Sequence, residues 1–182
     1  IQGAEQWDGT KISISMIMVA MLLNMFMIPN VPGASCEVRG NGEMFPLNGP
    51  SWSLFFEYIA NIMYAIFLRR LSNKALVAFT CLSGLGLLAF AIADMPGYGS
   101  LGVGWTLADG NLLGGFLRVT FPFSAGLLLS RKFRPMKIRG AFWVCSAMIL
   151  ALLIVPFISV GESTLFNRLY DTACILFFFP MI

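Results

Sequence analysis

Glu57 is the ionisable side chain whose position in this sequence most suggests chemistry. It lies two helical turns into the apolar segment 51–68, which begins directly after Pro50. A charged group at the centre of a membrane helix costs about 2.5–3.5 kcal/mol, so a carboxylate kept there is by default a functional candidate. Trp52, at the start of the same segment, suits the level of a membrane–water interface and could shape the mouth of a cavity.

Polar side chains recur along one face of this segment. Ser53, Glu57, Asn61 and Tyr64 are spaced by four, four and three residues, so they share one face of an α-helix. Such a stripe could line a polar cavity and bind substrate, or it could only join helices through hydrogen bonds. The second interpretation fits Glu57 less well, because hydrogen bonding between helices needs no ionisable group.

A second charge, Arg118, lies in the apolar segment 111–130, four residues before Pro122. Proline lacks the amide that would bond the carbonyl of Arg118, so a kink is expected there. At 1.5 Å per residue, Glu57 and Arg118 lie roughly 9 and 10 Å below the starts of their segments. The matched depths predict a Glu57–Arg118 pair lining a polar cavity; alternatively, Arg118 extends to the lipid headgroups.

Several kinds of site are excluded by residues that the sequence lacks. It has no histidine, which excludes His-based triads and His-ligated metal centres within these residues. Its four cysteines are scattered without a CxxC pair, so no disulfide framework or metal site is predicted. The GxGxxG run at 97–102 lies between two apolar segments, where a flexible loop is expected rather than a dinucleotide site.

The elements that carry these residues are those of a membrane protein. Hydrophobic residues make up 58% of the 182 residues and charged residues 12%, whereas a soluble domain averages about 25% charged. The apolar segments predict an all-α, polytopic transmembrane bundle, a single membrane domain over 1–182 with five full spans and a partial sixth. The predicted helices cover about 12–28, 51–68, 75–93, 111–130, 140–160 and 171–182. Because the last run is too short to span and the chain begins without Met, an internal fragment is expected.

The basic residues are distributed unevenly between the loops. If the helices alternate, the loops around 69–74 and 131–139 hold eight basic residues and no acidic one. The loops on the other side hold Arg39 and Arg168 against five acidic residues. Basic loops stay in the cytoplasm, so Glu57 is predicted in the outer half of the membrane. The segment 131–139 could also attract the phosphates of an anionic donor, or simply meet anionic lipid.

The amino-acid sequence around Glu57 resembles that of the acyltransferase-3 family of integral membrane acyltransferases. The similarity begins with Trp52, Ser53, Leu54 and Glu57 after an Asn-x-Pro turn. It continues in four further stretches: 43–48, 118–126 with Arg131, 167–171, and Phe179-Pro180. The resemblance covers nearly the whole chain but only the middle of a family member, which usually has about ten helices.

The resemblance implies an O-acyltransferase of a bacterial inner membrane. Such an enzyme moves an acyl group, often acetyl, from acyl-CoA as co-substrate to a hydroxyl of a glycan or lipid-linked sugar. Glu57 and Arg118 would be catalytic, and Trp52, Ser53, Asn61 and Tyr64 would bind substrate. The family's first helix carries an Arg and the His usually taken as base; neither is present here, so this chain alone is expected to be inactive without the missing helices. Membrane lipid is an expected partner, and no nucleic acid or bound cofactor is expected.

Two other classes of function fit parts of the same pattern. In a transporter or permease, Glu57 and Arg118 would line the path of a solute. A non-enzymatic scaffold would use the polar stripe only to join helices. The Trp-Ser-Leu-x-x-Glu motif favours the acyltransferase over the transporter and the scaffold.

The charge asymmetry predicts that loops 69–74 and 131–139 face the cytoplasm, whereas 29–50 and 94–110 face the other side. Single cysteines at Asn73 and Gly99, in a background without native cysteines, should therefore react with impermeant thiol reagents from opposite sides. Reaction from the same side would contradict the predicted number of spans.

Overall fold

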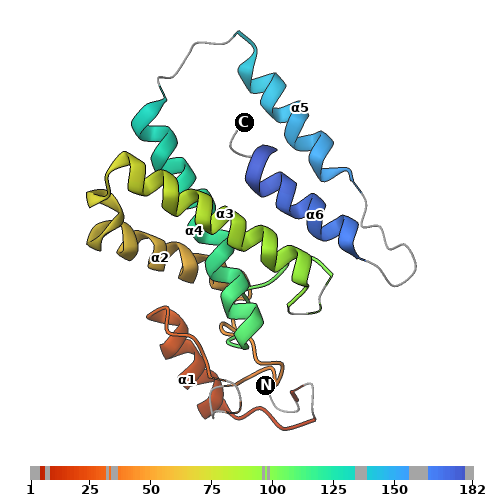
Figure 1. Cartoon of the computed structure of the whole chain (residues 1–182). Coiled ribbons are helices and arrows are strands. Elements are labelled where there is room, and N and C mark those ends of the chain that lie inside the picture. The colour runs from red at the N-terminus through yellow and green to blue at the C-terminus, as the bar shows by residue number, and fades with distance from the viewer. Residues whose placement is uncertain are drawn as a thin grey trace. The chain divides into compact units, whose positions relative to one another are not determined.

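The regular elements of this chain are helices. The computed structural model describes residues 5–6, 9–31, 33, 37–95, 97, 99–133, 139–155 and 164–178 (Figure 1). Within them lie α1 (Ile14–Met25), α2 (Ser51–Ile66), the 3-10 turn η1 (Leu68–Arg70), α3 (Asn73–Ala93), α4 (Asp109–Lys132), α5 (Ala141–Leu153), α6 (Leu165–Ala173) and the π-helical turn η2 (Cys174–Phe178). The predicted all-α class is confirmed over these residues, where only two isolated β-bridges depart from helix and loop.

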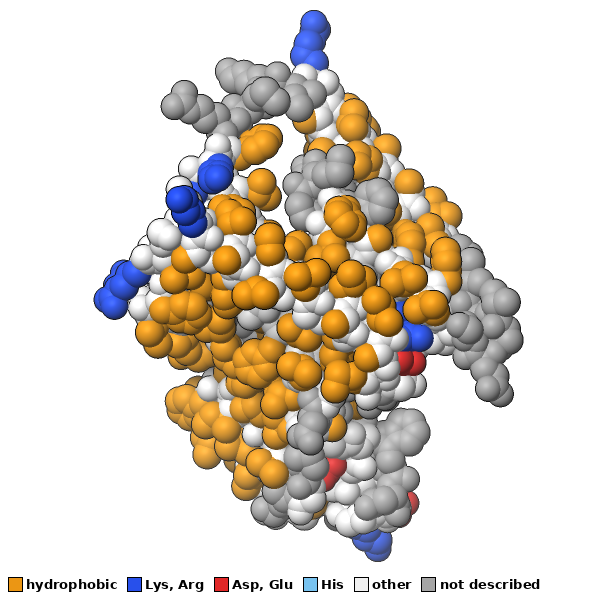
Figure 2. Space-filling model, in the orientation of Figure 1, with side chains coloured by type: hydrophobic (Ala, Val, Ile, Leu, Met, Phe, Trp, Pro, Cys, Tyr) orange, Lys and Arg blue, Asp and Glu red, His pale blue; other side chains and the backbone are white. Residues whose placement is uncertain are grey.

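Two of the described helices are long and apolar enough to cross a membrane. They are α3 and the part of α4 from Gly110 to Lys132. Only 33% and 22% of their apolar windows are buried, whereas the core helix of a soluble protein is mostly buried. Figure 2 shows hydrophobic side chains over most of the visible surface, with few Lys and Arg side chains among them. The helices α1, α2 and α5 have 12, 16 and 13 residues, so five full spans remain a prediction.

Local capping sets helix ends that hydropathy does not define. Ser13 accepts the amide of Met16 at 3.2 Å and begins α1 two residues after the expected start. The same helix ends at Met25 because Met27 adopts a left-handed backbone with φ 56°, and the amide of Ile28 bonds the carbonyl of Leu23. Capping by the Ser72 side chain likewise begins α3 at Asn73.

The C-terminal helix begins earlier than the apolar pattern indicates. A loop was expected up to residue 170, but α6 begins at Leu165. Its polar side chains Asn167 and Thr172 are 5% and 2% exposed, and the Thr172 hydroxyl donates to the carbonyl of Arg168 at 2.7 Å. A helix that buries polar side chains is invisible to a search for apolar runs. The end of the predicted helix 140–160, with Pro156, lies outside the described residues.

The contacts divide the chain into two compact units. Unit 1 comprises Ile1–Ile62 and Val103–Phe116, and unit 2 comprises Met63–Gly102 and Leu117–Ile182. Glu57 and Trp52 therefore belong to unit 1, whereas Arg118 belongs to unit 2.

In unit 1 the loops around the start of α2 are joined by backbone hydrogen bonds. The amide of Asn30 bonds the carbonyl of Met44 at 2.8 Å, and the amide of Met44 bonds the carbonyl of Trp105 at 2.9 Å. Asn111, which is 1% exposed, accepts the amides of Gly104 and Thr106 through its Oδ1. These bonds satisfy backbone groups of the loops and place Trp105 beside the segment that leads into α2.

Glycines allow close helix packing in each unit. In unit 1 the ring of Phe56, 2% exposed, occupies the space beside Gly115, where a Cβ would lie 2.2 Å from the ring Cζ. In unit 2, Gly84 of α3 lies against Phe121 of α4, and a Cβ there would come within 3.0 Å of the ring. Small residues at such positions let membrane helices approach.

Gly99 proves to be a constrained position for a labelling cysteine. It is buried with φ 67°, and a Cβ would lie 2.7 Å from the Thr164 side chain. Met95 in the same loop is 59% exposed, so Met95→Cys is the better substitution for the accessibility test.

The contact of Phe56 with Gly115 predicts that Gly115→Ala destabilises the fold, by about 1–3 kcal/mol as in other overpacked cores. Gly126→Ala on the same helix is the matched control, because a Cβ there meets no atom within 4 Å. Its unfolding free energy should stay equal or rise by up to about 1 kcal/mol through helix propensity. Equal unfolding free energies for the two variants, measured by denaturation in bicelles, would contradict this packing.

Candidate functional site

The polar stripe of α2 is present, but most of its side chains bond to their own helix. The Ser53 hydroxyl donates to the carbonyl of Pro50 at 2.9 Å, and the Asn61 amide donates to the carbonyl of Glu57 at 2.8 Å. The Glu57 carboxylate is exposed, and no described side chain forms a hydrogen bond or ion pair with it. Tyr64 is 39% exposed and packs edge-on to Phe123.

The predicted pairing of Glu57 with Arg118 concerns residues of different units. It therefore stays a prediction from their matched depths, and each residue is described in its own unit.

Trp52 lines a small pocket in unit 1. The pocket has a volume of about 220 Å³ and is lined by Glu43, Phe45, Gly49, Trp52 and Trp105. The Trp52 ring packs edge-on to Phe56 with 6.4 Å between ring centroids. The same ring lies beside Gly104, where a Cβ would come within 3.0 Å of it. The indole is therefore held by its neighbours, in line with a role in shaping a cavity.

Arg118 lines a larger cavity in unit 2, with a volume of about 460 Å³. The cavity lies among the loop 100–102, α4, α5 and the α6–η2 segment. Its polar lining is Ser100, Arg118, Tyr170 and Asp171. Its apolar wall is formed by Leu101, Gly102, Ile149, Leu152, Leu153, Val155, Cys174 and Ile175. This volume falls within the range of about 300–1,000 Å³ that is usual for small-molecule sites.

Asp171 connects the cavity to the glycine-rich loop. Its carboxylate accepts the amide of Leu101 at 3.0 Å, and its negative charge acts on the half-buried Arg118. The neighbouring Tyr170 hydroxyl donates to the carbonyl of Leu152 at 2.6 Å and so joins α6 to α5. Burial raises the pKa of the Tyr170 phenol, and a hydrogen bond with Cys174 acts in the same direction, so the phenol stays neutral at physiological pH.

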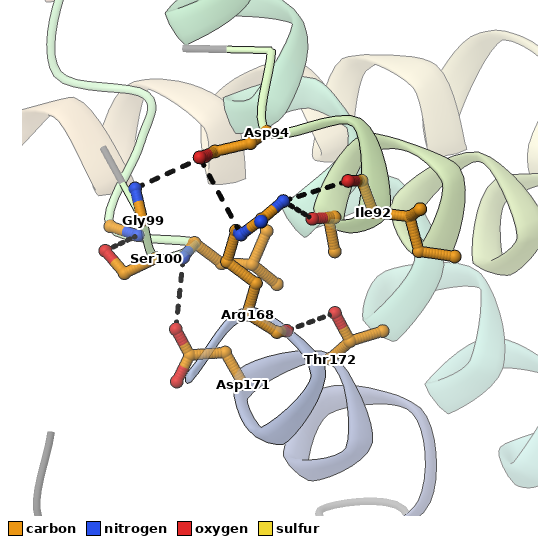
Figure 3. Close-up of polar contacts among 10 residues, drawn as sticks. Ile92, Asp94, Gly99, Ser100, Arg168, Asp171 and Thr172 are labelled. Atoms are coloured by element: carbon orange, nitrogen blue, oxygen red, sulfur yellow. Dashed lines mark hydrogen bonds and ion pairs between the residues drawn. The ribbon is translucent and has the colours of Figure 1, made fainter. Parts of the chain in front are cut away.

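Arg168 fastens α6 to the end of α3. Its Nη1 donates to the carbonyls of Ala91 and Ile92 at 2.6 and 2.9 Å, and its Nε lies 3.8 Å from the Asp94 carboxylate (Figure 3). Asp94 also accepts the amide of Gly99 at 3.2 Å. Because the last carbonyls of a helix lack partners within it, a guanidinium at this point satisfies two of them.

Arg168 and Asp171 were not among the predicted site residues, because Arg168 was expected in a loop and Asp171 at the start of a helix. A signal for both was present in their spacing. They are three residues apart, and with Asn167 and Thr172 they form the polar side of a helix.

The chemistry available in unit 2 is that of a guanidinium and a carboxylate in an apolar cavity. Arg118 could bind an anion or stabilise a developing oxyanion, and the aliphatic wall could hold a hydrocarbon chain. Among the described residues, no group of three His, Cys, Asp or Glu side chains is placed to hold a metal ion. No protein-family model, curated protein or solved structure matches the chain. The site is therefore interpreted from its own geometry.

The two carboxylates that accept amides of the loop 99–101 predict separable effects on amide protection. Asp171→Ala should speed hydrogen exchange of the Leu101 amide by roughly tenfold or more, the loss expected for a bond to a charged acceptor. The Gly99 amide, held by Asp94, should change little and is the internal control. Equal acceleration of both amides would show that the loop opens as one body and that Asp171 holds no particular amide.

Proposed function

We propose that the protein is a multi-pass membrane O-acyltransferase that moves an acyl group, acetyl being the expected one, from acyl-CoA to a hydroxyl group. The observation that carries the proposal is the unit 2 cavity, where Arg118 and Asp171 are the charged side chains of a mostly apolar wall. Arg118 lies on α4, one of two helices among the described residues that are long and apolar enough to span a membrane. Ionisable side chains are costly in such a place, and where they occur they are by default candidates for a functional site.

The cavity suits the donor half of an acyl transfer. An acyl thioester needs an apolar slot for its chain and positive charge or hydrogen-bond donors for the tetrahedral oxyanion. The aliphatic side chains of α5 supply the slot, and the Arg118 guanidinium supplies the charge. Asp171 holds the loop 100–102 at the edge of the cavity and balances the charge of Arg118. In this role Asp171 is a positioning residue.

The acceptor hydroxyl needs a base, and Glu57 is the unpaired carboxylate that the described part of α2 offers. A carboxylate is a weak general base for a hydroxyl, because it is much less basic than the alkoxide it would form. Glu57 therefore serves best by orienting a stronger base, as the carboxylate of a triad orients its imidazole. By the family resemblance, that base is a histidine outside these 182 residues.

We propose further that the protein lies in a bacterial inner membrane, with its basic loops in the cytoplasm. The acceptor would then be a glycan or lipid-linked sugar on the outer side. Support comes from the eight basic residues of two loops and from the two helices long enough to span.

Transfer from labelled acyl-CoA, in membranes that contain the full-length protein, tests the function. Arg118→Ala and Glu57→Gln should each lower kcat/KM by roughly 100-fold or more, the usual loss when an oxyanion donor or a proton-transfer partner is removed. If the two residues act as a unit, the double variant should be about as inactive as either single variant. Lys74→Ala, an exposed change in the first turn of α3, is the charge-matched control and should retain activity.

Two results would contradict this assignment in different ways. Additive losses in the double variant would separate Glu57 from Arg118 while leaving the enzyme in place. Solute uptake into proteoliposomes that requires Arg118, with no acyl transfer, would identify a transporter instead.

A further inference from the structure

The unit 1 pocket has a chemical character unlike that of the unit 2 cavity. Three of its five lining residues are aromatic: Phe45, Trp52 and Trp105. A fourth is Glu43, whose side chain is only 17% exposed, and the fifth is Gly49. No Lys or Arg is among the five. Aromatic ring faces and a carboxylate both attract a cation, and the Arg39 guanidinium paired with Glu43 makes the whole group of side chains neutral.

Size and shape restrict the ligand to a small group. The pocket volume of about 220 Å³ is below the range of about 300–1,000 Å³ usual for drug-sized ligands. A trimethylammonium head fits that space and needs no hydrogen-bond acceptor, because its surface is hydrocarbon, whereas a primary ammonium would also have to donate to the Glu43 carboxylate. Ring faces and one carboxylate are the partners that such a group requires.

A sugar ring suits the same pocket less well. Apart from the two indole N–H groups, Glu43 is the only polar side chain among the five lining residues. Its carboxylate already accepts two bonds from Arg39, at 3.0 and 3.1 Å, and one from the Asn41 amide at 2.9 Å. Several hydroxyls of a pyranose would therefore lose water without gaining partners, at a cost for each.

The Arg39–Glu43 pair adds a second feature. The Arg39 side chain is 47% exposed and lies beside the carboxylate that lines the pocket. A cation seated against Glu43 would bring a linked phosphate close to the Arg39 guanidinium, which binds such anions well. The pair thus complements both ends of a zwitterion.

We infer that Glu43, Phe45, Trp52 and Trp105 form a binding site for the ammonium group of a phosphate-linked amine of the phosphocholine or phosphoethanolamine type. The same head occurs in free zwitterions and in phospholipid headgroups. This pocket shares no lining residue with the Arg118 cavity.

Phosphocholine is the probe, titrated against the full-length protein in nanodiscs of phosphatidylglycerol, a lipid without an amine. Tryptophan emission reports binding, because two of the four tryptophans line the pocket. Gly49→Leu should weaken binding by at least about tenfold. Gly49 lines the pocket and a Cβ there meets no atom within 4 Å, so a larger side chain takes up open space without a clash in the fold. Glu43→Gln should weaken binding to a similar extent by removing the charge.

Matched controls separate the pocket from general effects. Trp143→Phe alters a 75% exposed tryptophan outside the pocket and should leave the affinity unchanged. Arg39→Gln should remove the preference for phosphocholine over choline while choline still binds. Adding phosphatidylcholine or phosphatidylethanolamine to the nanodisc distinguishes the sources: competition identifies a lipid headgroup, and its absence identifies a soluble zwitterion.

Three results would overturn the site. The first is no change in emission with phosphocholine or choline. The second is equal binding by wild type and Gly49→Leu, with both proteins showing the same melting temperature. The third is binding of methyl glucoside without binding of either amine, which would make the pocket a sugar subsite.

Discussion

A guanidinium among apolar helices must find oxygen acceptors, and this requirement organises unit 2. Arg168 donates to two carbonyls at the end of α3 and faces Asp94. Arg131, at the end of α4, donates to the carbonyls of Leu68, Arg69 and Leu71. Arg168 bonds carbonyls in the last turn of α3, and Arg131 bonds carbonyls in and after η1, so a charge that would be costly alone also attaches the end of one element to another. The segments they join are far apart in the sequence.

These contacts determine what the rest of unit 2 can hold. Arg168 attaches α6 to α3, and from there Asp171 reaches the Leu101 amide. That arrangement leaves a cavity bounded by α4, α5 and α6 with Arg118 in its wall. Tyr170 closes the other side through its bond to the carbonyl of Leu152. The cavity is therefore a consequence of how the charges are satisfied, and its chemistry is set by the guanidinium that remains in its wall.

Unit 1 is organised by packing rather than by charge: aromatic rings fill the spaces beside glycines. Phe56 occupies the space beside Gly115, and Trp52 lies against Gly104. Phe56 also packs edge-on to Phe116 with 5.2 Å between centroids. Where the face of such a ring borders a pocket it favours a cationic or apolar guest, because the face carries the negative part of the ring quadrupole. The two units thus offer sites of opposite charge preference.

The sequence by itself determined the helical class, the order of the helices and the positions of the charged side chains. These properties depend on local composition, on the apolar runs and on residues such as Ser51 and Pro122 within a few turns of each site. Glu57 and Arg118 could be identified as candidates because an ionisable group in an apolar run is visible without coordinates. The start of α6 could not be identified from the sequence, because its buried side chains Asn167 and Thr172 are polar.

Only the tertiary structure decided which side chains share a cavity. Asp171 belongs with Arg118 because a loop and a helix seventy residues apart meet through the bond to Leu101. Trp105 lies in the same pocket as Trp52 because the antiparallel bridge between Glu43 and Thr106, with the bond from the Met44 amide to the Trp105 carbonyl, brings a later loop beside the start of α2. Contacts between such distant segments depend on long-range hydrogen bonds and on the packing of aromatic rings against glycines. Hydropathy and spacing along one helix carry no information about either.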